Sequence, residues 1–331
     1  MHGALEHTRE ARDNQRLYQL QLRLGAAYSR QRLGLEAEKQ ATVLRGRGKH
    51  VHLENLYSLP SLIRFCLRCV GLYGRAMRNS RKLLLNQNRF VLPHLPAAFE
   101  GFRILHLSDL HIDMDEANLD ALISRVQGLD YDLCVLTGDF RRDTWGDIEP
   151  ALAGMARLRP HLKGRALAVL GNHDSITMVP DLEAMGYEML MNEHCTIERG
   201  EDTFWVAGVD DAHYYRVDNI ERAMEGIPVG VCSLLLSHTP EIFRQGAHGG
   251  FDLFMCGHTH GGQLCLPGGI PITLDARMPR RLGRGAWRHG EMQGYTSTGS
   301  GTSVLNVRLN CPPEVTLHTL TQGPYAPAEK A

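Results

Sequence analysis

The chain has 331 residues, of which 43% are hydrophobic and 22% charged, values that exclude a disordered or fibrous protein. No stretch approaches the roughly 18 uninterrupted apolar residues of a membrane-spanning helix, and the polar start of the chain lacks the apolar segment of an export signal. The eight cysteines are scattered, which favours reduced thiols over a disulfide framework. We therefore expect a cytoplasmic protein, soluble or peripherally attached to the inner face of the cell membrane.

The net charge of −1 conceals an uneven distribution. Residues 1–99 hold 17 Lys and Arg against 6 Asp and Glu, a balance of +11, whereas residues 100–331 hold 19 against 31, a balance of −12. This asymmetry indicates an acidic body with a basic arm that could contact phosphate groups of a membrane or a nucleic acid.

Residues 1–98 are expected to form a basic, mainly helical N-terminal extension. Good helix formers dominate 16–23 and 33–45, and a second helical pattern extends over 59–85. In this second pattern the basic residues share one helix face, and an apolar set shares another. The basic residues are Arg64, Arg68, Arg75, Arg78 and Lys82, and the apolar set is Leu62, Cys66, Val70, Tyr73, Met77 and Leu84.

Two interpretations of the 59–85 helix remain open. It resembles an amphipathic helix that lies on an anionic membrane surface. Alternatively, its apolar face packs on the body while the arginines stay solvated. Cys66 and Cys69 are expected to serve packing, because no second Cys or His pair follows at zinc-site spacing.

From residue 99 to 322 short apolar runs alternate with helical stretches, which predicts an α/β (α+β) domain. A loose tail is expected over 323–331. The predicted strands are 102–107, 133–136, 166–170, 204–209, 233–236, 253–256, 295–298, 304–309 and 314–319, and the predicted helices are 119–126, 148–158 and 182–186.

Five of the predicted strands are followed directly by segments that contain Asp, His or Asn. Because ligands bind beyond the carboxyl ends of strands in α/β sheets, these side chains are expected to converge. In chain order they are Asp109 and His111, then Asp139, then Asn172, His173 and Asp174, then His238, and finally His258 and His260.

This set is rich in metal ligands. Mixed carboxylate and imidazole donors suit manganese, iron or zinc better than magnesium or calcium. The ligands are too many for one ion and fit two, and a pair of ions ~3.5–4 Å apart is the arrangement that clamps a phosphoryl group. Asp-x-His and His-x-His spacing places both side chains on one side of an extended segment.

These five motifs together resemble the calcineurin-like metallophosphoesterase superfamily over roughly residues 100–320. The strings GVDD (208–211), GHTHGGQ (257–263) and NCPPE (310–314) are similar to its YkuE/YaeI-type phosphodiesterase branch, which includes UDP-2,3-diacylglucosamine pyrophosphatases of lipid A synthesis. The resemblance implies a four-layer αββα sandwich with a dinuclear metal site at the strand ends.

The resemblance also implies roles for the residues. Asp109, His111, Asp139 and His260 would hold one metal, and Asp139, Asn172, His238 and His258 the other, with manganese favoured over iron or zinc. His173 would protonate the leaving group, with Asp174 orienting its imidazole. Arg141, Arg142 and His213 are candidates for substrate contacts. Cys256 and Cys265 are expected to be buried thiols without a chemical role.

The implied activity is hydrolysis of a phosphodiester or pyrophosphate bond by a metal-bound hydroxide. The favoured substrate is a lipid-linked nucleotide such as UDP-2,3-diacylglucosamine, cleaved at an anionic membrane surface to release UMP. A phosphodiesterase for soluble nucleotides or nucleic acid is the alternative, although the arm has few aromatic residues for base stacking. A metal-binding scaffold without catalysis is disfavoured, because a scaffold does not need His173.

Overall fold

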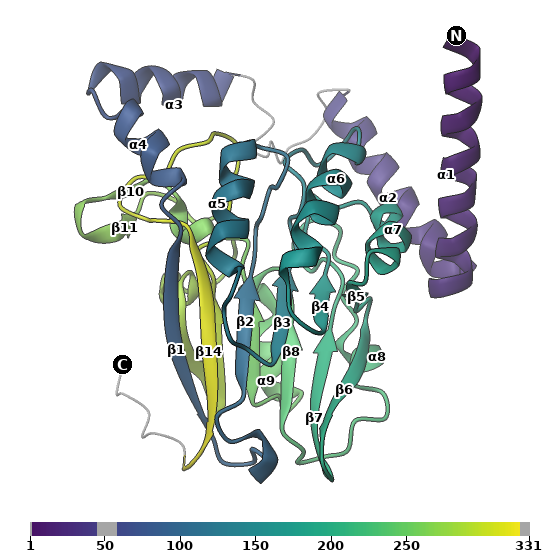
Figure 1. Cartoon of the computed structure of the whole chain (residues 1–331), viewed down its shortest axis with the longest axis vertical. Helices are drawn as coiled ribbons and strands as arrows, with labels where there is room; N and C mark the ends of the chain where they lie inside the picture. Colours follow the sequence, from purple (N-terminus) through teal and green to yellow (C-terminus); the bar gives the residue numbers. More distant parts are fainter. Residues whose placement is uncertain (1, 45–57, 325–331) are drawn as a thin grey trace.

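The computed structural model describes residues 2–44 and 58–324, which are built around two six-stranded sheets (Figure 1). The first sheet has the order β1-β14-β2-β3-β4-β5, and the second has the order β12-β13-β9-β8-β7-β6. The first sheet consists of β1 (Leu84–Leu92), β14 (Glu314–Gln322), β2 (Arg103–Leu107), β3 (Leu133–Thr137), β4 (Ala166–Val169) and β5 (Glu188–Met189). The second consists of β12 (Gly285–His289), β13 (Met292–Thr296), β9 (Leu253–Cys256), β8 (Ser233–Leu236), β7 (Asp202–Gly208) and β6 (Glu193–Arg199).

Alternating side chains on the central strands bury both faces of each sheet. In β2, Ile104 belongs to the core between the two sheets, whereas its neighbour Leu105 belongs to the core under the outer helices. Helices α5 (Glu116–Val126), α6 (Glu149–Leu158) and α7 (Val179–Ala184) cover the first sheet. Helices α8 (Ile220–Met224) and α9 (Phe243–His248) cover the second. The predicted four-layer αββα sandwich with an N-terminal helical extension is confirmed.

The predicted domain boundary at residue 99 is too late. Strand β1 pairs in parallel with β14 over its whole length, so the sheet begins at Leu84, inside the segment expected to be an extension. The predicted strand at 304–309 is also wrong. Leu305 and Val307 instead lie in a turn-rich segment and pack against residues of helices α3 (Ser58–Cys69) and α4 (Tyr73–Ser80). The part of the expected tail beyond residue 324 lies outside the described residues.

Helices α3 and α4 replace the single helix expected over 59–85. The chain turns between them at Gly71, whose φ of 69° lies in the left-handed region that favours glycine. The buried residues are Leu67 and Ala76, whereas Leu62, Cys66 and Val70 of the predicted apolar face are exposed. The expected packing role of Cys66 and Cys69 is therefore wrong, because both thiols are exposed. No helix in the described ranges is long and apolar enough to cross a membrane.

Helices α1 (His2–Leu24) and α2 (Ala26–Leu44) pack on the body through ion pairs. Arg16 pairs with Asp181 at 2.6 Å and with Glu149 at 2.8 Å, and Arg23 pairs with Glu193 at 2.7 Å. Part of the charge asymmetry between the two halves of the sequence is thus resolved inside the molecule.

The most deeply buried of these arm contacts is made by Arg32 of α2, which is fully buried. Its guanidinium lies 3.1 Å from Asp210, also fully buried, and 3.6 Å from the centre of the Tyr215 ring. It also donates to the backbone carbonyl of Asp174 at 3.3 Å. Helix α2 is therefore connected to the loop that carries Asn172, His173 and Asp174.

We expect Arg32→Ala to lower the free energy of unfolding by about 3–5 kcal/mol, because Asp210 would remain buried without its cation. Arg30→Ala, which removes an exposed arginine from the same helix, is the matched control and should change it by no more than about 0.5 kcal/mol. Chemical denaturation of both variants measures the difference. Equal stabilities would show that the buried pair contributes nothing.

Candidate metal centre

The carboxyl ends of β2, β3, β4, β8 and β9 bring the predicted ligands together at one edge of the two sheets. All five strands are parallel within their own sheet, so the loops that follow them leave from the same side. Backbone bonds join these loops, since the amide of Asp109 donates to Gly138 at 2.9 Å and that of His111 to Asp139 at 3.0 Å. The sequence-predicted convergence is thus present.

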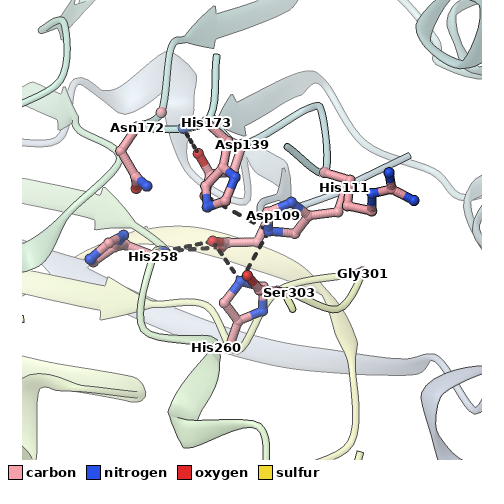
Figure 2. Close-up of polar contacts among 12 residues, drawn as sticks. Asp109, His111, Asp139, Asn172, His173, His258, His260, Gly301 and Ser303 are labelled. Atoms are coloured by element: carbon pink, nitrogen blue, oxygen red, sulfur yellow. Dashed lines mark hydrogen bonds and ion pairs between the residues drawn. The ribbon is translucent and has the colours of Figure 1, made fainter. Parts of the chain in front are cut away.

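Asp109, His111 and His260 form the first group of side chains that could hold an ion. Their side chains point toward one another in Figure 2, with the two imidazole Nε2 atoms 3.2 Å apart. His260 Nε2 lies 3.4 Å from a carboxylate oxygen of Asp109. All three residues are buried.

Asp139, His238 and His258 form the second group, and Asn172 lies beside it. His238 Nε2 is 3.0 Å from Asn172 Oδ1, 3.1 Å from His258 Nδ1 and 3.3 Å from Asp139 Oδ2. The same Asp139 oxygen is 3.8 Å from His111 Nε2 in the first group. Asp139 therefore lies between the two groups, in the position that a bridging carboxylate would need.

Three of the four imidazoles are oriented by backbone carbonyls on the side away from the groups. The ring nitrogens that face these carbonyls are His111 Nδ1 with Arg141 (2.8 Å), His238 Nδ1 with Thr137 (2.7 Å) and His258 Nε2 with Asp275 (2.5 Å). A proton on each of these nitrogens leaves the lone pair on the other nitrogen, which faces the ligand groups, as metal-binding histidines require.

The electrostatics of the site also fit cations. Burial lowers the pKa of His258 and His260 well below the usual value, with neighbouring His213 and Arg308 adding to the effect, so both rings are neutral. For His238 burial acts in the same direction, but Asp139 and Asp109 outweigh it and raise the pKa to about 10. The carboxylates thus attract a positive charge to this place, which a metal ion could supply instead of a proton.

The backbone at the site is held in an unusual conformation. Five of the seven candidate ligands have positive φ, between 38° and 69°: Asp109, His111, Asp139, His258 and His260. Non-glycine residues adopt this region at a cost, and residues in such conformations cluster at functional sites. A Cβ at Gly171 would overlap the Asp139 carboxylate, and one at Gly257 would overlap Asp109, so these glycines permit the close approach of the loops.

His173 lies at the rim of the two groups. Its Nε2 is 4.0 Å from Asp139 Oδ2, its ring meets that of His111 edge-on at 5.0 Å, and Thr144 Oγ1 lies 3.4 Å from its Nδ1. Its backbone amide donates to Asp139 at 2.9 Å. Nε2 therefore faces the candidate metal site, where a proton donor would be needed.

The Asp174 carboxylate binds backbone amides, whereas the sequence predicted that it orients the His173 ring. Its carboxylate accepts hydrogen bonds from four backbone amides, those of Asp139, Phe140, Arg141 and Gly171. These bonds hold the β3 loop against the β4 loop. Burial, with the nearby Asp139 adding to it, raises the pKa of Asp174 to about 6.

The three expected substrate contacts have different surroundings. Arg141 is buried and donates to the carbonyls of His173, Thr144 and Gly146, so its guanidinium supports the loops and is not available to a substrate. Arg142 is exposed and pairs with Asp143 at 2.6 Å. His213 remains next to the site, with its ring centre 4.2 Å from that of His258 and its Nδ1 3.2 Å from Glu241.

Sequence reasoning missed two buried residues of the site. Arg308 is fully buried, and its guanidinium donates to the His260 carbonyl at 2.9 Å and to Nδ1 of the same ring at 3.2 Å. Ser303 is buried as well; its backbone amide and carbonyl both bond to the side chain of Gln263, and its hydroxyl has no hydrogen-bond partner within the described ranges. Both lie in the 304–309 region or next to it, where the apolar alternation suggested only a strand. Cys256 and Cys265 are buried, as expected.

Comparison with known proteins agrees with this geometry. The Calcineurin-like phosphoesterase family model matches residues 102–262. YkoQ, an uncharacterized metallophosphoesterase of Bacillus subtilis, is 30% identical over 256 residues, which cover 74% of this chain and 93% of YkoQ. Phosphodiesterase YaeI of Escherichia coli is 29% identical over 65% of this chain and 81% of YaeI. A transmembrane protein with a metallophosphoesterase domain from Danio rerio is 30% identical over 69% of this chain and 55% of that protein.

The matched region contains the strand ends that carry both candidate ligand groups. The family consists of hydrolases that act on phosphoesters, and it uses divalent metals. The similarity to YkoQ extends over nearly its whole length. The chain therefore belongs to the calcineurin-like metallophosphoesterases.

Proposed function

We propose that this metallophosphoesterase cleaves a phosphodiester or pyrophosphate bond with two divalent cations bound at the strand ends. The observation that carries the proposal is the position of Asp139, within 4 Å of imidazole nitrogens of both ligand groups. Manganese is the favoured metal, with iron or zinc as alternatives, because the donors mix oxygen and nitrogen. The first cation would be held by Asp109, His111, Asp139 and His260, and the second by Asp139, Asn172, His238 and His258.

Two bound cations would polarise the phosphoryl oxygens, neutralise developing charge and lower the pKa of a water molecule. His173 would hold a proton at Nε2 and deliver it to the leaving oxygen, a contribution of about 10²–10⁴-fold. The carbonyls of Arg141, Thr137 and Asp275 would keep the metal-binding nitrogens aimed at the cations. Asp174 would act as a positioning residue through the backbone amides that it accepts.

Asp139→Asn and His173→Asn are expected to separate metal binding from catalysis. The first should lose both manganese binding and hydrolysis of a soluble aryl phosphodiester, because the carboxylate shared by both groups is removed. The second should retain manganese and lose about 10²–10⁴-fold in kcat. Calorimetric titration with Mn²⁺ and initial rates measure the two effects. Undiminished turnover by His173→Asn would remove this residue from the mechanism.

For the substrate we propose a lipid-linked nucleotide such as UDP-2,3-diacylglucosamine, an intermediate of lipid A synthesis, cleaved at the inner membrane surface to release UMP. The support comes from α3 and α4, which combine exposed arginines with exposed apolar side chains. Among the described residues, no carboxylate lies within ion-pair distance of Arg64, Arg68, Arg75 or Arg78, in contrast to the paired arginines of α1 and α2. An anionic membrane surface is the partner that fits unpaired cations beside apolar groups.

Removal of the whole N-terminal arm cannot test this proposal. A deletion to residue 90 would take away Arg32 and most of β1 as well as α3 and α4. The measurement is instead UMP release from UDP-2,3-diacylglucosamine by the full chain with Mn²⁺, with Asp139→Asn as the control. We expect rapid release that is absent in the variant.

If UMP is not released while a soluble aryl phosphodiester is still cleaved, the lipid-linked substrate is wrong and the metal chemistry stands. Cleavage of single-stranded nucleic acid under the same conditions would then favour the alternative phosphodiesterase function. Steep loss of that activity with rising salt would indicate phosphate contacts by the basic residues.

A further inference from the structure

The large apolar side chains that are exposed in the described chain are concentrated on two short elements, α3 and the hairpin β10–β11 (Cys265–Leu266 and Ile270–Pro271). The exposed side chains are Leu62, Phe65 and Val70 on α3, and Leu266, Ile270 and Ile272 on or next to the hairpin. Their exposed fractions range from 52% to 64%, and they make up six of the eleven large apolar side chains exposed within the described ranges. Such a concentration marks an interaction surface.

The two elements are neighbours. Leu264, which immediately precedes β10, packs on the same apolar cluster as Leu67 of α3 and Ala76 of α4. Residues 305–309, which complete this cluster, also bond through their backbone to α4 and to the hairpin, since Arg308 donates to Ala76 at 2.9 Å and Cys265 donates to Leu309 at 2.9 Å. Figure 1 shows α3, α4 and the hairpin at the end of the molecule where β2, β3 and β4 terminate. We refer to α3, α4 and residues 264–272 as the α3–hairpin surface.

The charge on this surface has one sign. Residues 55–99 contain seven basic residues and no acidic one, and Arg64, Arg68, Arg75 and Arg78 are exposed. Two copies of such a surface would repel each other. Proteins that bind single-stranded nucleic acids stack bases on several aromatic rings. Phe65 is the one aromatic residue among the six exposed apolar side chains of this surface, so a nucleic acid is a poor fit. Aliphatic groups beside cations match the interfacial layer of an anionic bilayer.

We propose that the α3–hairpin surface docks on an anionic lipid bilayer and that the hairpin, not only the basic helices, enters the membrane interface. The proposal deepens the membrane role in the proposed function and rests on it for its biological purpose. The apolar side chains contact acyl chains just below the headgroups, and the arginines contact lipid phosphates.

The hairpin is also fixed to the candidate metal centre at both of its ends. On one side it follows His260 closely, and Gln263 between them accepts from the Leu309 amide at 3.1 Å. On the other side Asp275 accepts from His258 Nε2 at 2.5 Å. The segment that carries Ile270 and Ile272 is thus connected at one end to His260 through the chain and at the other end to His258 through the Asp275 carbonyl.

The test is sedimentation of the full chain with vesicles of phosphatidylcholine, with or without about one third phosphatidylglycerol. We expect binding to the anionic vesicles and about tenfold or more weaker binding for Ile270→Ser/Ile272→Ser, because two apolar side chains lose their acyl contacts. Arg64→Gln/Arg68→Gln should weaken binding to anionic vesicles by about tenfold and leave the weak binding to neutral vesicles unchanged.

Val229→Ser is the matched control, since Val229 is an exposed apolar residue before β8, at the opposite end of that strand from the site. It should bind vesicles as the unmodified chain does. Thermal unfolding and Mn²⁺ titration of every variant show whether the fold and the metal centre are intact.

No binding to anionic vesicles by the unmodified chain would overturn the proposal, as would unchanged binding by the hairpin variant. Association of the chain with itself through this surface, detected by analytical ultracentrifugation and abolished by Ile270→Ser/Ile272→Ser, would assign the surface to a second copy and equally overturn it. Because the vesicles carry no substrate, failure of UMP release with intact vesicle binding would contradict the substrate and leave the docking surface standing.

Discussion

The structure around the candidate site depends on burial of the Asp139 carboxylate among imidazoles. Desolvation opposes a charge there, but His238 and His173 overcome it and hold the pKa of Asp139 well below its usual value. Neighbouring residues hold this carboxylate and the surrounding imidazoles in place. Gly171 leaves space for the carboxylate, Asp174 fixes the amide of Asp139, and backbone carbonyls turn His111 and His238 toward it. Two cations in this place would neutralise a carboxylate that otherwise faces His238, whose pKa it helps to raise to about 10.

The seven candidate ligands could be predicted from the sequence because each follows an apolar run that forms a buried strand. The strand ends at Leu107, Thr137, Val169, Leu236 and Cys256 lie within one or two residues of the predicted ends. Short-range patterns suffice here, since the parallel arrangement alone brings the loops together. The roles of single polar residues were less predictable. Nothing in the sequence around Arg141 or Asp174 indicates that their partners are backbone groups of other loops.

Long-range pairing explains the remaining differences. β1 was missed because its residues (LLNQNRFVL) mix apolar and polar side chains, and its partner β14 lies about 230 positions later in the chain. Arg308 and Arg32 have ordinary sequence neighbours and are buried only because distant segments surround them. The turn at Gly71 divides α3 from α4, so the single apolar face expected over 59–85 is interrupted and Leu62 and Val70 are exposed.

The pairing of β14 has a consequence for the synthesis of this protein. β14 lies between β1 and β2, so these two strands have no sheet contact with each other until residues 314–322 leave the ribosome. Arg308, which bonds to the His260 carbonyl, is also made after the ligand-bearing loops. The nascent chain therefore completes its first sheet only after residues 314–322 have been made. A truncated product that stops before β14 would lack the strand that pairs with both β1 and β2, and it would expose the edges of these two strands to aggregation and proteolysis.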